Sequence, residues 1–263
     1  MKSTDRPRTI HCVGESHASF FSGTWEIQAI WPEPAACELP GVFNYRLGAA
    51  TAHNLRKPES STSSWTRLWE VLDTISPMPE KLILLSFGEI DCRMHLLPQH
   101  EKTARPLTEL VANTVGNYMQ AVLALREAGY QTALWAPPPP TLQEGTNKSA
   151  YLCHGTYEER KRVTRMFNDQ LATACIPLGV PCISLYNKLV ARDGRTRREY
   201  FSDGIHLSPL ALPMAARAIS AACPNFRIPI SPIRLLINPF RLLMRRMRLG
   251  WRQVRLAPPN WSN

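Results

Sequence analysis

Short apolar runs alternate with longer segments of helical periodicity along most of this chain. Several of the short runs are continuously apolar, as strands of a parallel sheet covered on both faces must be. The predicted strands are residues 9–13, 43–47, 81–87, 131–136 and 181–185. Apolar residues recur every three or four positions in the longer segments, which predicts helices at 107–128, 157–178 and 209–222. Strands that alternate with helices predict βαβ units and a doubly wound parallel sheet.

Local signals mark where these elements end. Gly129 and Gly179 follow the first two helices as stop signals, and Ser208 is placed as an N-cap before Pro209 at the start of the third. Residues 57–64 and 137–148 are predicted loops. Since the loops that leave the carboxyl ends of strands form the ligand crevice of such a fold, chemistry is expected there.

The 263 residues suffice for one α/β domain of ordinary size with an appendage, and their formal charge of +10 is unevenly distributed. Asp203 is the last acidic residue, and nine arginines follow it. Without these nine, 22 basic and 21 acidic residues remain. Nucleic-acid binding is therefore not expected of the main domain, because such a domain spreads its basic residues over a folded face.

The sequence also bears on location. The start of the chain is polar and shows no secretory signal, and no stretch of about 18 uncharged apolar residues could span a bilayer. The seven cysteines are odd in number and scattered, which suits reduced thiols. We expect a cytoplasmic protein. A peripheral position on the inner face of the membrane is compatible with this location.

A serine follows the first predicted strand, in Gly14-Glu15-Ser16-His17. Glycine permits a tight turn that exposes the hydroxyl of Ser16, which makes it a candidate nucleophile. Taken alone, such a serine is more often only a helix N-cap.

An acid and a histidine precede the last helix. Asp203 and His206 are three residues apart on one turn, so the carboxylate can accept from one imidazole nitrogen while the other faces a hydroxyl. Without a partner serine, a capping aspartate and a surface histidine would be the better interpretation. Two further turns follow strands, Gly48 in one and Gly88-Glu89-Ile90-Asp91 with nearby Arg93 in the other. The four turns together are much more specific than any one.

This pattern resembles the SGNH (GDSL-like) hydrolase superfamily of serine esterases and acyltransferases over residues 9–222. Gly14-Glu15-Ser16 is similar to its Gly-Asp-Ser block, Gly48 to its glycine block, and Gly88-Glu89-Ile90-Asp91 to its Gly-x-Asn-Asp block. Asp203 to His206 matches its Asp-x-x-His block. The resemblance implies a three-layer α/β/α flavodoxin-like sandwich with a mostly parallel five-stranded sheet. It also implies ester hydrolysis or acyl transfer through an acyl-serine, with no metal or cofactor.

On this resemblance Ser16 is the nucleophile, His206 the general base and then acid, and Asp203 the residue that orients His206. The backbone N–H groups of Ser16 and Gly48 hold the oxyanion together with a family asparagine, whose position Ile90 occupies here. Losing one such donor typically costs about 100- to 1,000-fold in rate, so another group substitutes or the activity is weak.

Several side chains near these turns are candidates for supporting roles. Arg93 is the best substitute donor by type, ahead of Asn44 and Asn54. Glu89 and Asp91 are expected to orient their turn or to pair with Arg93, and His17 to line the pocket or cap the helix. Cysteine and histidine also occur together at 92–95 and 153–154, but without zinc spacing, so no metal site is expected.

The end of the chain differs from the rest. We predict a hydrolase domain over residues 1–225 and a basic amphipathic appendage over 226–263, with prolines 229, 232 and 239 forming a semi-rigid connector. From Pro239 onward, a helix would gather apolar side chains on one face: Phe240, Leu243, Met244, Met247, Trp251 and Val254. Arginines would gather beside them: Arg241, Arg245, Arg248, Arg252 and Arg255. Such a helix could lie on an anionic membrane surface, dock on a protein partner or cover an apolar patch of its own domain.

The sequence leaves three functional hypotheses. The first is a serine esterase or O-acyltransferase that acts on a small O-acyl ester, with an acylated sugar or glycan as one candidate. The second is a noncatalytic or weakly active glycan- or acyl-binding protein, marked by Ile90. The third makes the basic tail the main function, as a tether to anionic lipid or nucleic acid.

Overall fold

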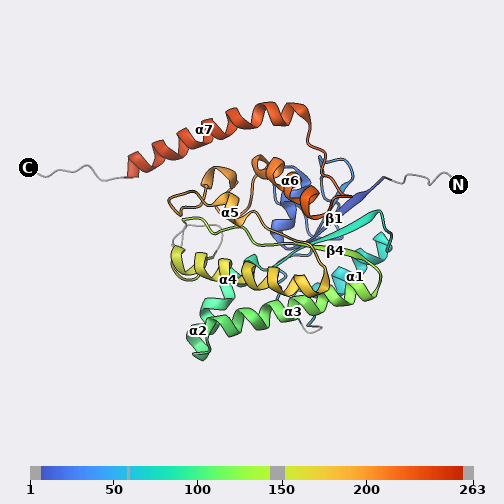
Figure 1. Ribbon diagram of the computed structural model, residues 1–263. Coiled ribbons are helices and arrows are strands. Elements are labelled where there is room, and N and C mark those ends of the chain that lie inside the picture. The colour runs from blue at the N-terminus through green and yellow to red at the C-terminus, as the bar shows by residue number, and fades with distance from the viewer. Residues whose placement is uncertain (1–6, 58–59, 143–151, 257–263) are drawn as a thin grey trace, which may run out of the picture.

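A five-stranded parallel sheet is central to the structure, a computed structural model that describes residues 7–57, 60–142 and 152–256 (Figure 1). The strands are β1 (Thr9–Gly14), β2 (Val42–Arg46), β3 (Lys81–Ser86), β4 (Gln131–Trp135) and β5 (Cys182–Ile183). They are ordered β2-β1-β3-β4-β5, and every neighbouring pair is parallel. This is the flavodoxin-like order of a doubly wound fold, as predicted. The last strand is shorter than expected, because the backbone turns at Leu185 into a short helix.

Helices cover both faces of the sheet (Figure 1). On one face lie α1 (Ser64–Ile75), α3 (Leu107–Glu127) and α4 (Tyr157–Cys175), and on the other η1 (Ser16–Ser22) and α6 (Leu212–Ala222). In β3, Ile83 and Leu85 pack toward the first layer, whereas Leu82 and Leu84 pack toward the second. Both faces are buried, which explains the continuously apolar sequence of this strand.

The remaining elements are short, apart from the last helix. They are α2 (Leu96–Thr103), α5 (Tyr186–Leu189), the π-helical turn η2 (Asp91–His95) and the 3-10 turns η3 (Ile176–Leu178), η4 (Arg198–Tyr200) and η5 (Pro209–Ala211). Gly129 and Gly179 have positive φ directly after helical segments, as their stop signals predicted. Ser208 is the N-cap residue of η5, with Pro209 in the first turn as predicted, but its hydroxyl donates to Tyr200 O at 2.9 Å and does not cap a helical N–H group.

The C-terminal helix α7 (Pro232–Leu256) begins earlier than its sequence suggested. Pro232 occupies its first position, where the missing N–H has no helical partner to lose, and Pro239 lies inside the helix. The predicted connector is therefore helical from Pro232. The structure does not describe the side chains of four residues predicted for this helix: Trp251, Arg252, Val254 and Arg255. Residues 143–148 of the second predicted loop also lie outside the described residues. Across the described residues, each helix is too short or too polar to cross a bilayer.

Candidate active site

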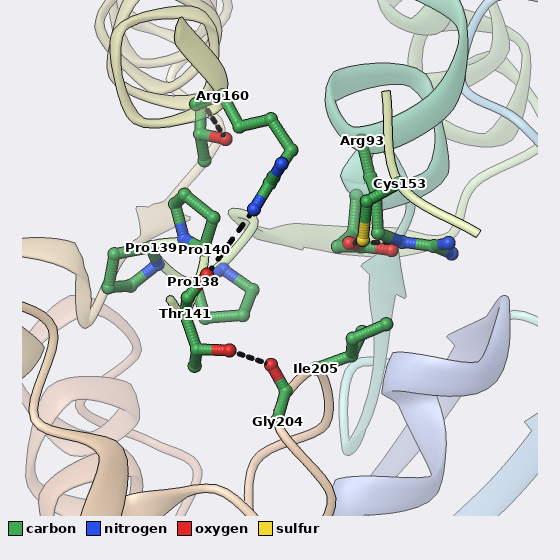
Figure 2. A pocket seen from close by; sticks show the side chains of 11 residues that line it. Arg93, Pro138, Pro139, Pro140, Thr141, Cys153, Arg160, Gly204 and Ile205 are labelled. Carbon is green, nitrogen blue, oxygen red and sulfur yellow. Dashed lines mark hydrogen bonds and ion pairs between the residues drawn. The ribbon is translucent and has the colours of Figure 1, made fainter. Parts of the chain in front are cut away.

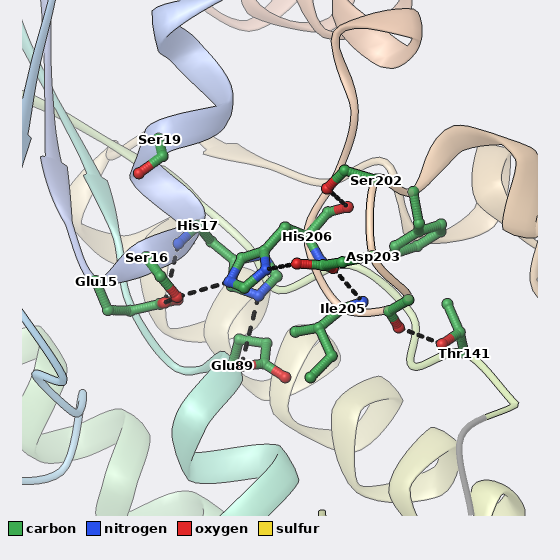
Figure 3. A network of polar contacts seen from close by, with 12 residues as sticks. Glu15, Ser16, His17, Ser19, Glu89, Thr141, Ser202, Asp203, Ile205 and His206 are labelled. Atoms are coloured by element: carbon green, nitrogen blue, oxygen red, sulfur yellow. Dashed lines mark hydrogen bonds and ion pairs between the residues drawn. The ribbon is translucent and has the colours of Figure 1, made fainter. Parts of the chain in front are cut away.

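Three side chains from opposite ends of the sequence form a chain of hydrogen bonds at the carboxyl edge of the sheet (Figure 3). Ser16 is the first residue of η1, directly after β1, while Asp203 and His206 lie on the turn that precedes α6. The Oγ atom of Ser16 is 2.8 Å from Nε2 of His206, and Nδ1 of His206 is 2.7 Å from Oδ2 of Asp203. The fold thus joins the first and last of the predicted turns.

Asp203 shapes the turn that carries His206. Its Oδ1 accepts from the backbone N–H groups of Ile205 and His206, both at 2.9 Å. Burial raises the pKa of the Asp203 carboxyl, but the hydrogen bond and charge of His206 and these N–H groups lower it by more, so the pKa lies well below its ordinary value. An ionised Asp203 holds the proton of His206 on Nδ1, which leaves Nε2 as the acceptor for Ser16.

The two residues before Ser16 determine its position at the end of β1, where its side chain is partly exposed. A Cβ atom on Gly14 would lie 2.1 Å from Ser86 O, so only glycine lets β1 end this close to β3. The N-cap of η1 is Glu15, whose Oε2 accepts from His17 N at 3.0 Å. Ser16 therefore does not serve as the cap. Its hydroxyl is within hydrogen-bond distance of two acceptors, Oε2 of Glu15 at 3.0 Å and Nε2 of His206 at 2.8 Å.

His17 packs behind the candidate base. Its ring centroid is 4.7 Å from that of His206, and its Nε2 is 3.5 Å from Oε2 of Glu89 (Figure 3). Burial lowers the pKa of His17, but the charges of Glu15 and Glu89 raise it by more. Glu15 and not His17 caps the helix, whereas the pocket-lining role of His17 stays a prediction. The contacts of His17 with His206 and Glu89 were not suggested by the sequence.

Glu89 and Arg93 form the pair that the sequence suggested. Arg93 Nε donates to Glu89 Oε1 at 2.8 Å, and a second guanidinium nitrogen donates to Leu152 O. Burial raises the pKa of Glu89, but the hydrogen bonds and charges of His17 and Arg93 lower it by more, to about 2. Glu89 is therefore an anion held between His17 and the guanidinium of Arg93. The use of Arg93 as an oxyanion donor stays a prediction, and Asn44, a weaker candidate, donates instead to Ala18 O.

Asp91 does not pair with Arg93 in the described contacts, but binds backbone. It is buried, and its carboxylate accepts from the N–H groups of Ala52 and His53 in the loop that follows β2. Burial raises its pKa to about 6, against the lowering effect of these hydrogen bonds. Gly48 opens this loop with φ +89°, and Leu47 N donates to Gly14 O at 2.8 Å. Gly48 and Ser16 therefore share one edge of the sheet.

A cavity lies next to the turn of Asp203 and His206, where Gly204 and Ile205 line it (Figure 2). Residues 138–141, which follow β4, form one wall of the cavity. Arg93 and Arg160 lie on opposite sides of the cavity (Figure 2). Its enclosed volume is about 20 Å³. Thr141 donates to Gly204 O and so fixes the wall to the catalytic turn. The proline run after a strand was the signal for this wall, whereas nothing local marked Arg160.

Within the described residues, one buried group has the composition of a metal site. Ligand atoms of Glu15, His17 and Glu89 all lie within 4.8 Å of one another. Glu15 Oε2 accepts from Ser16 Oγ and from His17 N, and Glu89 Oε1 accepts from Arg93. Nε2 of His17 and Oε2 of Glu89 are 3.5 Å apart and have no further hydrogen-bond partner among the residues that the structure describes.

Comparison with known proteins adds the family. The model of the GDSL-like lipase/acylhydrolase family matches residues 12–211. The chain belongs to this family. The match includes Ser16, Gly48, the turn of Asp91, and both Asp203 and His206.

Several solved structures have a similar fold to this chain. A GDSL-like lipase from Bacteroides thetaiotaomicron is 12% identical with a TM-score of 0.51, covering 82% of this chain and 87% of its own. A carbohydrate acetylesterase family member from Sinorhizobium meliloti is 17% identical with a TM-score of 0.50, covering 81% and 96%. No curated protein matches the sequence.

Proposed function

We propose that this acylhydrolase is a serine ester hydrolase in which Ser16, His206 and Asp203 form the catalytic triad. The observation that carries the proposal is the continuous hydrogen-bond chain from Ser16 Oγ through His206 to Asp203. A nucleophile and base within hydrogen-bond reach, with the base oriented by a third group, are the requirements for acyl transfer to serine.

The reaction follows from this geometry. Ser16 Oγ attacks the ester carbonyl carbon while its proton passes to Nε2 of His206, and Asp203 stabilises the imidazolium that forms. Backbone N–H groups of Ser16 and Gly48 hold the negative oxygen of the tetrahedral intermediate. Its collapse breaks the bond to the alcohol, which leaves with the proton from His206, and the acyl group stays on Ser16. Water, activated by His206, then releases the acid; a second alcohol in place of water would make the reaction an acyl transfer.

A small acyl group is our candidate for the acid side of the ester. The cavity lined by Gly204 and Ile205, next to Asp203 and His206, is a candidate site for part of the substrate. An acylated sugar or glycan remains our candidate for the alcohol side of the ester. A panel of p-nitrophenyl esters of increasing chain length, followed by acetylated monosaccharides, would measure both preferences through kcat/KM.

The decisive experiment is Ser16→Ala, with Ser61→Ala as a control at an exposed serine outside the site. We expect Ser16→Ala to abolish both hydrolysis of p-nitrophenyl acetate and labelling by a fluorophosphonate probe, with an unchanged melting temperature. Ser61→Ala should keep both. Turnover or labelling in Ser16→Ala equal to the wild type would refute the proposal.

Ile90 favours one alternative, a binding protein with little or no activity. That alternative predicts saturable binding of an acylated ligand without turnover, and no labelling of Ser16 in the wild type. The same two measurements on the wild type therefore decide between the hypotheses.

A further inference from the structure

The C-terminal helix α7 contacts the body of the protein through a polar side. It packs on η4 and η5, next to the catalytic turn, and forms the outermost layer on that side of the molecule (Figure 1). Four side chains spaced three or four residues apart are the ones turned toward the body: Arg234, Asn238, Leu242 and Arg245. Asn238 is the most buried, at 5% exposure. Three of these four are polar, which is the reverse of an ordinary amphipathic helix on a globular protein.

Arginines provide the specific contacts of this attachment. Arg234 pairs with Glu38 at 2.8 Å, and Arg246 pairs with Glu199 at 2.8 Å. Arg245 donates to the carbonyl oxygens of Phe201 and Ser202, and its guanidinium lies 5.3 Å from the ring centroid of Trp25. Hydrogen bonds and ion pairs at both ends of its described part thus fix which side of α7 faces the protein.

The opposite side of α7 is an apolar stripe that faces solvent. Its members recur at intervals of three and four and are 50% to 81% exposed: Ile233, Leu236, Phe240, Leu243 and Met247. Contiguous exposed apolar surface of this kind marks an interaction site. We call these five residues the outer stripe.

The charge beside the outer stripe indicates what covers it. Arg241 and Arg248 are exposed next to the stripe, and no acidic residue follows Asp203 in the sequence. Phe240 is at the border of the outer stripe, because it also lines a groove of about 340 Å³ between α7 and the body, together with Trp25, Arg241 and Arg248. An apolar stripe beside strongly basic side chains is complementary to a partner with an apolar interior and an anionic surface. A second copy of α7 would instead bring arginines against arginines.

We propose that α7 lies in the interface of an anionic lipid bilayer, with the outer stripe buried among the acyl chains and Arg241 and Arg248 at the headgroups. The bilayer then lies on the far side of α7 from the body. Since Arg245 holds the backbone of Phe201 and Ser202, directly before Asp203, the catalytic turn is fixed close to the membrane.

Co-sedimentation of the full chain with vesicles tests this proposal. We expect binding to vesicles that contain phosphatidylglycerol, weak binding to phosphatidylcholine alone, and a bound fraction that falls as salt rises. Leu236→Glu combined with Phe240→Glu should reduce the binding constant about tenfold or more, since two apolar contacts become charged. The control is Ile176→Glu, which changes an apolar residue of 76% exposure on η3 and should bind like the wild type.

A second pair of variants separates charge from apolar burial. Arg241→Glu with Arg248→Glu should abolish the preference for phosphatidylglycerol, whereas Arg162→Glu on the exposed side of α4 should not. Unchanged melting temperatures and p-nitrophenyl acetate hydrolysis would show that all variants are folded. Equal binding of both vesicle types, or full binding by Leu236→Glu with Phe240→Glu, would overturn the proposal. So would a concentration-dependent dimer that this double variant abolishes and that binds no vesicles, since the stripe would then cover a second copy.

Discussion

The carboxylate of Asp91 accepts a hydrogen bond of 2.7 Å from the backbone N–H of Ala52 and one of 3.2 Å from that of His53. These bonds join the end of β3 to the loop that begins with Gly48. Gly48, whose N–H is a candidate oxyanion donor, therefore lies in a loop that a buried acid of η2 holds in place.

Replacement of Asp91 by asparagine should change how stability depends on pH. Burial raises the pKa of Asp91 from 3.8 to about 6. Because the folded-state pKa is the higher one, this group favours the fold below about pH 4, and its contribution is lost as the pH rises to about 6. Urea unfolding across this range should show the wild type losing roughly 3 kcal/mol relative to Asp91→Asn. A difference that does not vary with pH would contradict this assignment.

Asp203→Asn should lower kcat by about 10³- to 10⁴-fold while the protein remains folded. The asparagine oxygen can still accept from Ile205 N and His206 N, but its amide cannot hold the proton on Nδ1 of His206. Asp193→Asn, at an exposed turn that accepts from Arg195 N, is the control. Steady-state kinetics with p-nitrophenyl acetate would measure both, and equal effects at the two positions would remove Asp203 from the triad.

Ile90→Asn should raise kcat about tenfold or more, because the third oxyanion donor of the family would be restored. Ile90→Leu keeps the apolar character and should leave kcat unchanged. If the rate does not rise in Ile90→Asn, another donor already serves the intermediate, and Arg93 is then the first residue to replace.

Gly88→Ala should destabilise the protein by about 2 to 4 kcal/mol. Gly88 has φ +111°, and a Cβ atom there would lie 2.5 Å from Cζ of Phe167. Gly116→Ala is the matched control, since Gly116 has open space around it in α3 and should gain about 0.5 to 1 kcal/mol. Urea denaturation of both variants would check the opposite signs.

The sequence predicted the sheet well because its strands are buried on both faces, which gives β3 a continuously apolar sequence. The meeting of Ser16, Asp203 and His206 at one edge of the sheet was also predictable, since each lies on a short turn at the end of an element. Helix α1 was missed because it starts at Ser64, inside a serine-rich segment with loop composition. Its apolar residues Leu68, Val71, Leu72 and Ile75 carry the helical spacing that could have revealed it.

Two other contacts between distant parts of the chain were beyond prediction. The pair of His17 and Glu89 depends on how η1 packs beside the end of β3, and no local pattern encodes that. Periodicity gave the two sides of α7, but which side meets the body depends on partners such as Glu38 and Glu199, which lie far away in the sequence.

The hydrogen bond between Ser16 and His206 spans 190 residues of sequence. During synthesis Ser16 leaves the ribosome early, yet His206 is among the last parts of the domain to appear. Under the proposed function, Ser16 gains its base only when the turn of Asp203 and His206 has joined the sheet. Hydrolysis would then report finished folding, and a fragment that ends before Asp203 should have none.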